Sequence, residues 1–370
     1  MRETTIRFAW RDKLATGRFT TGICLHGHTM HSEECLSFLP RYLRHVPGIS
    51  QMIAGYERGR SRIDFGRAFW TPPLSPASAL HLEGNQIANM NLRPLVSLTD
   101  HDNIEAGIAL QVTAGQDEVP VSVEWTVPYE RSILHLGIHN LPQASARRWL
   151  AAFADYTQTP EERLLPDILR ALVRLPEVLI VLNHPFWLEE GVQEENHRRA
   201  LDRVLRECLP WLHAFELNGT RGWTENLQVV RLAREYGRPA ISGGDRHACE
   251  PAACINLTNA STFSEFVSEI RAGQSAIWFL PHYCEPIAVR VLEAARDILR
   301  PYPEYPGRER WTDRFFYRGD DGIARKLSEL WRDRVPWTLT AASGFLQIAA
   351  ASRLRLALRL FVTEGGEMVP

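Results

Sequence analysis

Histidine and carboxylate residues recur along the chain at spacings that suit metal ligation. His26 and His28 follow a short apolar segment, Gly22 to Leu25, that is typical of a buried strand. On a strand, residues i and i+2 point to the same face, so both imidazoles can reach one ion. By itself the pair is weak evidence, because two histidines at this spacing are more often incidental. Glu33 and Glu34 offer a carboxylate nearby, and the sequence does not decide between them; we favour Glu34.

Further candidate ligands each lie on, or soon follow, a short apolar segment. They are His101 in Thr99-Asp100-His101, Glu124 after Val121 to Val123, His135 between Leu134 and Leu136, His184 after Val178 to Leu182, and Asp245 and His247 after Pro239 to Ser242. A carboxylate such as Glu124 can bridge two divalent ions, since it has two oxygens. Histidine and carboxylate side chains can also be buried in a core with all their hydrogen bonds made. Finding so many of them at successive strand ends for that reason alone would be a rare coincidence. The sequence therefore predicts a polynuclear metal site.

The elements that must position these side chains alternate along the chain. From residue 20 to about 255, short apolar segments alternate with segments of helical periodicity, which favours parallel β/α units. A TIM-type barrel places its active site at the carboxyl ends of such strands. We expect helices over Arg147 to Tyr156, Pro166 to Leu175, Asn196 to Leu209 and Asn226 to Tyr236.

Two segments do not fit this alternation. The first, about 38–76, is rich in proline, glycine and arginine, and we interpret it as an insertion over the barrel mouth after the first strand. The second follows about residue 290, and we interpret it as a C-terminal helical extension, 291–370, with helices over 322–331 and 345–361. The expected fold is therefore an α/β barrel over 1–290 with a helical appendage.

Composition and charge narrow the classes of function. The 370 residues are 45% hydrophobic, enough for one large core or two ordinary ones. The 42 basic and 44 acidic side chains give a net charge of −2, too balanced for a general electrostatic grip on nucleic acid or membrane. Six scattered cysteines without a CxxC pair favour reduced thiols. The N-terminal segment is charged where a signal peptide is apolar, and no apolar run reaches about 18 residues, so we expect a soluble, cytoplasmic protein.

The ordered set of motifs resembles the PHP family, named for polymerase and histidinol phosphatase. The family pattern is an HxH pair followed closely by an acidic or histidine ligand, then TDH, a bridging glutamate, a histidine, HP and a terminal DxH. It is matched over about Ile23 to Cys254 by His26 and His28, His101, Glu124, His135, His184, and Asp245 with His247. The chain departs from the family in having two glutamates after Ser32, where Asp or His is usual, and in a longer separation between the HxH and TDH motifs.

The resemblance implies a distorted seven-stranded (β/α) barrel of the TIM type that holds two or three divalent ions, commonly zinc, manganese or iron, and hydrolyses phosphoesters. The expected ligands are His26, His28, Glu124 and Asp245 for the first ion, Glu124, His135 and His184 for the second, and Glu34, His101 and His247 for a possible third. Ions about 3.5–4 Å apart can lower the pKa of a bridging water to about 7 and clamp both oxygens of an in-line displacement. The nucleophile would then be a metal-bridged hydroxide.

Asp245, Arg246 and His247 are the residues that we expect to act in catalysis. The guanidinium of Arg246 could hold a substrate phosphate, or it could form an ion pair with a surface carboxylate. Asp100 is expected to orient a ligand or to bind metal itself. Other candidates are more often structural or surface residues: Glu216 and Asn218 as support for ligands, Arg60, Arg62 and Arg221 as substrate contacts, His31 as a proton donor, His139 as a further ligand or a loop histidine, and Trp70, Trp125, Phe186, Trp187 and Trp223 as an aromatic wall.

Three functions compete. The leading hypothesis is a metal-dependent phosphoesterase acting on a small phosphorylated substrate or a short nucleic-acid fragment, with no membrane partner. An amidohydrolase-type barrel also begins with HxH and ends with Asp, but many of its binuclear members use a carbamylated barrel lysine. The chain has only two lysines, Lys13 before the first strand and Lys326 in the tail, which fits that subtype poorly. Hydrolysis of C–N or ester bonds stays open, as does a metal-stabilised module without turnover.

Overall fold

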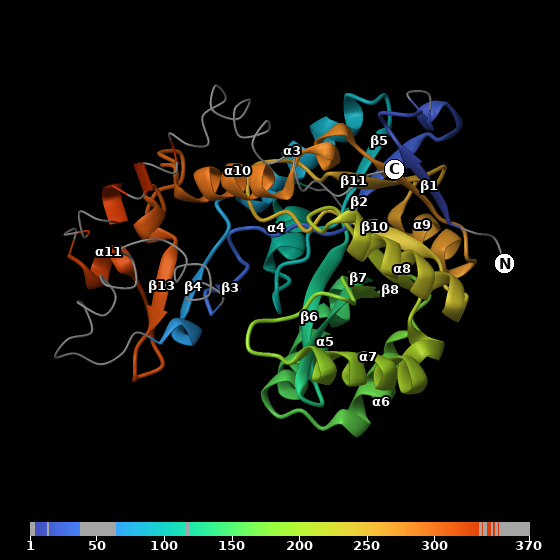
Figure 1. Ribbon diagram of the computed structural model, residues 1–370, viewed down its shortest axis with the longest axis horizontal. Coiled ribbons are helices and arrows are strands. Elements are labelled where there is room, and N and C mark those ends of the chain that lie inside the picture. Colours follow the sequence, from blue (N-terminus) through green and yellow to red (C-terminus); the bar gives the residue numbers. More distant parts are fainter. Residues whose placement is uncertain are drawn as a thin grey trace.

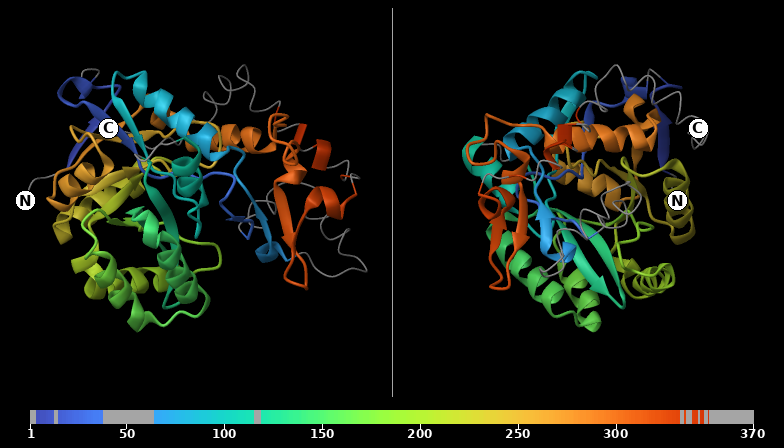
Figure 2. Two further views of the ribbon diagram at one scale, coloured as in Figure 1. Left: turned by 180° about the vertical axis from the view of Figure 1, so that it is seen from behind. Right: turned by 60° about the vertical axis from the view of Figure 1, so that its left-hand side comes forward.

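The computed structural model describes residues 4–12, 15–37, 64–114 and 119–332, with a few positions between 335 and 347. Two five-stranded sheets form the centre of the molecule, and a separate four-stranded sheet lies to one side of them (Figure 1). Helices surround the central sheets in both further views (Figure 2). Most of the predicted insertion, residues 38–63 with Arg60 and Arg62, lies outside the described residues.

The first central sheet has the strand order β1-β12-β11-β2-β5. β1 pairs in parallel with β12, and β2 with β5, whereas β11 is antiparallel to both of its neighbours. β2 and β11 are buried along their whole length, as expected of strands covered on both faces. The strands are β1 (Thr5–Phe8), β2 (Thr21–Cys24), β5 (Arg93–Val96), β11 (Cys254–Thr258) and β12 (Ala276–Phe279).

The second central sheet has the order β10-β9-β8-β7-β6. β8, β9 and β10 are parallel, but β7 is antiparallel to both β6 and β8. Only two residues join β6 to β7, and such a short connection allows only antiparallel pairing. The prediction of parallel β/α units is therefore wrong for β6 and β7. The strands are β6 (Val121–Tyr129), β7 (Ser132–Leu141), β8 (Leu179–Asn183), β9 (Ala214–Asn218) and β10 (Ala240–Gly243).

The two central sheets are not closed into a barrel among the described strands. They meet at two seams, each of which is a single isolated bridge: Gly27 with Arg246, and His101 with Glu124. β2, β5 and β10 end before the chain reaches these bridges, so no continuous ladder joins the sheets. The predicted α/β class is confirmed, whereas the closed TIM-like barrel is not.

The four helices predicted between strands are present as α5, α6, α7 and α8. α3 shows how the sequence sets a helix start: Ser75 Oγ accepts a hydrogen bond from the amide of Ser78, and Pro76 takes the first helical position. None of the described helices combines the length and the apolar character that crossing a membrane requires. The α-helices are α3 (Pro76–Ala88), α4 (Glu105–Ala114), α5 (Gln143–Gln158), α6 (Leu165–Leu172), α7 (Glu194–Cys208), α8 (Trp223–Tyr236), α9 (Phe263–Arg271), α10 (Ile287–Leu299) and α11 (Leu327–Leu330).

The four-stranded sheet, here called the accessory sheet, combines the two segments that interrupt the β/α pattern. Its order is β14-β13-β4-β3, with every pair antiparallel. β4 belongs to the predicted insertion, and β13 and β14 belong to the C-terminal extension. The four strands lie together at the left of Figure 1, apart from the central sheets. They are β3 (Glu34–Cys35), β4 (Ala68–Trp70), β13 (Phe315–Arg318) and β14 (Ala324–Lys326).

The prediction of a purely helical extension is wrong. Residues 324–326 form β14, so the helix expected over 322–331 shrinks to α11, because pairing with β13 outweighs local helical propensity. The helix expected over 345–361 lies outside the described residues apart from Gln347. The fully buried Arg314 anchors this region, since its guanidinium donates to backbone carbonyls that include those of Ile298 and Arg300 at the end of α10.

Candidate metal centre

The predicted ligands meet at the seams between the central sheets. Gly27, between the first two histidine ligands, bridges Arg246, which lies between the last two ligands. At the other seam His101 bridges Glu124. Because β2, β5 and β10 end just before these bridges, and β6 passes through one of them, side chains from distant segments converge there.

The first group of ligands surrounds one oxygen of Glu124. Oε2 lies 2.9 Å from His26 Nε2 and 3.4 Å from His28 Nε2. Asp245 Oδ1 lies 3.7 Å and 3.5 Å from the same two nitrogens. Asp245 has a φ of 49°, in the left-handed region that is costly for a residue with a Cβ and recurs at functional sites. All four side chains are buried, so the structure brings together the whole predicted first group.

The second group faces the other oxygen of Glu124. Oε1 lies 3.0 Å from His184 Nε2 and accepts a hydrogen bond of 2.9 Å from Asn183 Nδ2. His135, His184 and Glu124 each offer a ligand atom within 4.8 Å of the others. The two carboxylate oxygens therefore face two different histidine groups, the arrangement expected of a bridging ligand. The sequence analysis missed Asn183, although it directly precedes His184.

The third group is built around Glu34. Its Oε2 lies 3.2 Å from His247 Nε2 and 3.6 Å from His101 Nε2, and its Oε1 lies 3.7 Å from His28 Nδ1. Glu33 turns to the opposite side and pairs with Arg318 at 3.0 Å, because neighbouring residues on a strand alternate between faces. The structure therefore places Glu34 inside the cluster and Glu33 outside it.

The accessory sheet sets the position of Glu34. This residue begins β3 and pairs with Trp70 of β4, which in turn pairs with Phe315 of β13. The ring of Trp70 lies 6.2 Å from that of His247. The C-terminal extension thus reaches the ligand cluster through the strands of one sheet.

Glu216 and Asn218, at the carboxyl end of β9, support the ligands from behind. Glu216 Oε1 lies 2.6 Å from His26 Nδ1, and its Oε2 accepts the amide proton of His184 at 2.9 Å. Asn218 Nδ2 lies 3.1 Å from both Glu216 Oε2 and Asp245 Oδ2. Such contacts fix the ring orientation of a metal-binding histidine and increase its basicity.

Ser32 and Asp100 hold the loop that carries His28 and Glu34. Ser32 Oγ donates to Glu34 Oε1 at 2.7 Å and accepts the amide proton of His101 at 3.1 Å. The carboxylate of Asp100 accepts hydrogen bonds from the amide and hydroxyl of Thr29 at 2.5 Å and 2.7 Å. Asp100 therefore acts on the loop rather than as a ligand. Sequence analysis gave Ser32 no role of its own, although it stands two residues before Glu34.

Charge within the cluster is balanced between carboxylates and imidazoles. Burial by itself would lower the pKa of His247, but Glu34 and Asp245 outweigh it and raise the pKa to about 9. For His28 burial dominates, helped by His247, and the pKa falls to about 3. Burial would raise the pKa of Glu124, yet the neighbouring histidines hold it well below its usual range. Without metal, His247 is therefore protonated at neutral pH.

We expect metal uptake at pH 7.5 to release protons. His247 keeps its proton below its pKa of about 9, and an imidazole nitrogen must lose that proton before it can bind a cation. Calorimetric titration of the metal-free protein in two buffers of different ionisation enthalpy measures the number released. His247→Gln should release fewer protons than the wild type. If the heat of metal binding were the same in both buffers, no protons would be released and the protonated state assigned to His247 would be wrong.

Gly243 makes room for Glu216 at the end of β10. A Cβ at this position would lie 1.6 Å from Glu216 Oε1, so Gly243→Ala must displace the carboxylate that holds His26. We expect metal affinity to fall by about 10- to 100-fold, the usual effect of losing such a supporting contact. Gly84→Ala is the control, because a Cβ there meets nothing closer than 3.9 Å. Equal metal affinity in the two variants would contradict this role for Glu216.

Arg246 forms a buried ion pair, and the structure corrects the phosphate-binding role given to it. Its Nε donates to Glu83 Oε1 at 2.8 Å, and the other guanidinium nitrogens donate to the carbonyls of Ala248 and His28. Both charged side chains are almost fully buried. The geometry therefore favours the ion-pair alternative, with an interior partner instead of a surface one.

Arg221 is the cation that lies beside the cluster. Its Nη2 lies 3.3 Å from Asp245 Oδ2, and its guanidinium stacks 3.6 Å above the ring of Trp187. Its Nε is buried and has no hydrogen-bond partner among the described residues. The loop after β8 thus provides an aromatic surface that holds a positive charge next to Asp245.

The remaining candidates lie away from the ligand atoms. His139 is not in a loop; it lies on β7, its Nδ1 is 2.9 Å from Ser97 Oγ, and burial lowers its pKa to about 3. None of the contacts described for His31 reaches a ligand. Several of the aromatic candidates pack in or against the hydrophobic core: Trp125, Phe186 and Trp223.

Comparison with known proteins gives only distant similarities. Neither a protein-family model nor a curated protein matches the sequence. Similar solved structures are PsfC from Pseudomonas syringae (13% identity, 56% of this chain and 84% of that chain, TM-score 0.36), an amidohydrolase from Chromobacterium violaceum with bound sulfate and no metal (14%, 61% and 87%, TM-score 0.35), and a proposed metal-dependent phosphoesterase from Bifidobacterium adolescentis (12%, 55% and 92%, TM-score 0.34). At this distance, any conclusion about function depends on the ligand cluster itself.

Proposed function

We propose that the protein is a metal-dependent hydrolase that acts on phosphoesters and holds two or three divalent ions such as zinc, manganese or iron. The observation that carries the proposal is the convergence of the nine predicted ligands into overlapping groups at the sheet seams. Buried carboxylates need positive charge beside them; without metal the neighbouring histidines supply it, and divalent cations would supply it when bound. Six of the nine ligands are histidines, a donor set that suits transition metals better than magnesium or calcium.

The residues around the cluster have distinct tasks in this proposal. Bound ions would lower the pKa of a water molecule and polarise a phosphoryl oxygen. Glu124 holds two groups of ligands at a fixed separation, and Glu216 and Asn218 fix the orientation of His26 and Asp245. His247 is the candidate for moving a proton when ions occupy only the first two groups, since it is partly exposed at the edge of the cluster.

Arg221 supports a phosphoester over a neutral substrate. A guanidinium beside a metal cluster can bind a phosphate oxygen. Because Arg221 already stacks on Trp187, its side chain would lose little conformational freedom when it binds the phosphate. The substrate would be a phosphomonoester, a nucleotide or a short oligonucleotide. Lys326 belongs to β14 of the accessory sheet and donates to the Gly307 carbonyl, so it is no candidate for a carbamylated metal ligand.

The test is turnover by protein loaded with manganese, zinc or iron. The substrates tested are phosphomonoesters, nucleotides and short oligonucleotides, together with carboxyl esters and amides that carry no phosphate. We expect phosphoester turnover, and Arg221→Met should lower kcat/KM by about 10- to 100-fold, the effect of losing one charged hydrogen bond. Arg221→Lys, which keeps the charge, should lose less.

Each alternative has its own outcome in this experiment. Turnover of only the carboxyl esters or amides would favour an amidohydrolase-like enzyme. A module without turnover would show no activity with any metal, and Asp245→Asn would then lower only the thermal stability of the loaded protein. In the proposed enzyme the same substitution removes activity while the fold persists.

A further inference from the structure

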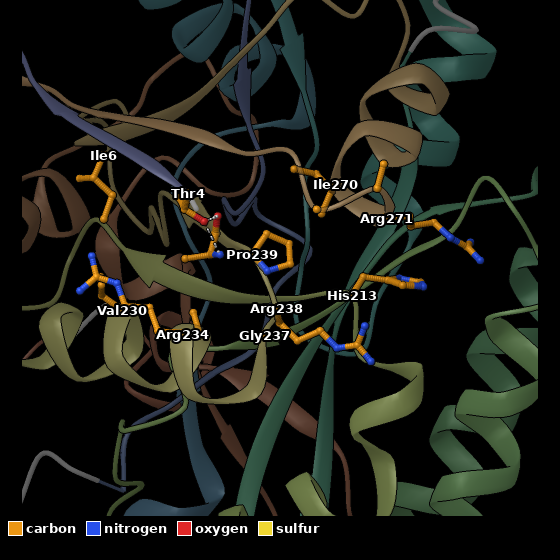
Figure 3. A pocket seen from close by; sticks show the side chains of 14 residues that line it. Thr4, Ile6, His213, Val230, Arg234, Gly237, Arg238, Pro239, Ile270 and Arg271 are labelled. Atoms are coloured by element: carbon orange, nitrogen blue, oxygen red, sulfur yellow. Dashed lines mark hydrogen bonds between the residues drawn. The ribbon is translucent and has the colours of Figure 1, made fainter. Parts of the chain in front are cut away.

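A cavity lies at the amino ends of the central strands. Its volume is about 490 Å³, within the range of small-molecule sites, and it is bounded by β1, by the residues that precede β9 and β10, and by α8 and α9 (Figure 3). His213 immediately precedes β9, and Arg238 lies two residues before β10.

This cavity is separate from the metal centre. His213 at the cavity directly precedes β9, which ends with Asn218 at the ligand cluster, and a strand rise of about 3.3 Å per residue puts these two residues about 17 Å apart. The opposite end of a β/α fold usually serves stability rather than chemistry. A cluster of cations at this end therefore has no explanation in the proposed hydrolysis.

Arg238 and Arg271 bring positive charge to the cavity. Arg234, Arg238 and Arg271 line it together with His213, and no aspartate or glutamate is among the described residues that line it. Arg271 donates to backbone carbonyls that include those of Val173 and Leu175, and Arg238 Nη2 donates to the Leu209 carbonyl. These acceptors are neutral, so they leave the charges of Arg271 and Arg238 uncompensated.

Two buried N–H groups at the cavity lack acceptors within the described part of the chain. His213 is only 8% exposed, and its Nδ1 accepts the amide proton of Ile180 at 2.9 Å, which leaves the ring proton on Nε2. Among the described residues, neither that Nε2 nor the buried Nε of Arg238 has a hydrogen-bond partner. Burial, with Arg271 and Arg238 nearby, lowers the pKa of His213 to about 3, so the neutral ring is a donor at physiological pH. Buried donors without acceptors are rare in folded proteins.

The arrangement suits an oxyanion with a small organic body. An anionic oxygen would accept hydrogen bonds from His213 Nε2 and Arg238 Nε and would offset the arginine charge. Ile6, Val230 and Ile270 line the same cavity and provide an apolar surface for the rest of the molecule. Figure 3 shows His213, Arg238 and Arg271 on one side of the cavity, with Ile6 and Val230 on the other.

We propose that this cavity binds a small organic molecule that carries a phosphate or carboxylate group, independently of the metal centre. The probes are inorganic phosphate, glycerol 2-phosphate and citrate, titrated calorimetrically into the metal-free, full-length protein at pH 7.5 and constant ionic strength. We expect saturable binding of at least one probe with one site per chain. Arg238→Met and His213→Asn should each weaken it at least tenfold; the asparagine oxygen can still accept from the Ile180 amide.

Two further variants keep the test decisive if those substitutions disturb folding. Ala272 is exposed and lines the cavity, so Ala272→Glu should place a carboxylate at its mouth and weaken binding at least tenfold, whereas the uncharged Ala272→Gln should not. Arg221→Met should leave binding unchanged, because Arg221 lies at the metal centre. A Kd of about 10 mM corresponds to a binding free energy of about 3 kcal/mol. Failure of every probe to bind saturably with a Kd below about 10 mM would overturn the proposal. So would binding that Arg221→Met abolishes and the cavity variants leave intact.

Discussion

Glu124→Gln should lose at least one equivalent of bound metal and nearly all activity. Glu124 contributes one oxygen to each of two histidine groups, with Oε2 at 2.9 Å from His26 Nε2 and Oε1 at 3.0 Å from His184 Nε2. Glutamine keeps the length of the side chain but replaces one oxygen with an amide nitrogen that cannot bind a cation, and it removes the negative charge. Loss of a supporting contact costs about 10- to 100-fold in metal affinity, so loss of the shared ligand itself should cost more.

Metal content by elemental analysis and kcat/KM on the best phosphoester measure this effect. Glu195→Gln is the matched control, because it makes the same chemical change at an exposed position on α7, where Glu195 pairs with Arg199. The control should keep its metal and its activity. If Glu124→Gln bound as much metal as the control, the two histidine groups would not share this carboxylate, and the proposed arrangement of ions would be wrong.

Most of the ligand residues could be found from the sequence because they follow recognisable local patterns. A buried strand is recognisable from a short apolar segment, and a polar side chain directly after it lies at a predictable edge of the sheet. That reasoning located His26, His184 and Asp245 at strand ends without knowledge of the strand order. It also yielded the helices α5 to α8, whose periodicity is local.

Features that depend on pairing between distant segments could not be found in this way. The prediction of a closed barrel was wrong because closure requires continuous ladders at both seams, whereas Gly27 and His101 each form a single bridge. β14 was predicted as helix, since only its pairing with β13 makes it a strand. The choice between Glu33 and Glu34 depended on the register of β3 with β4, which no local pattern reveals.

Arg246 shows the same limit at the level of one side chain. The sequence placed it correctly between two ligands, and a phosphate contact was the natural chemical interpretation of that position. Its partner, Glu83, is on α3 and belongs to no motif. The structure replaces a catalytic role with a structural one because Glu83 has no exposure and accepts from both Arg246 and the amide of Ala252.

Glu83→Gln should lower the free energy of unfolding by about 3–5 kcal/mol, the cost of leaving one partner of a buried ion pair without its counter-charge. Arg246 would keep its positive charge in the interior, where it also binds the His28 carbonyl and so holds the HxH segment against the loop of Asp245. Chemical denaturation of the metal-free protein measures the change without interference from bound cations.

The double variant Glu83→Leu with Arg246→Met should recover much of the loss, since it removes both charges together. If Arg246 served mainly to bind substrate phosphate, Arg246→Met would instead reduce phosphoester turnover while leaving the unfolding free energy within about 0.5 kcal/mol of the wild type, the usual range for substitutions without a structural role.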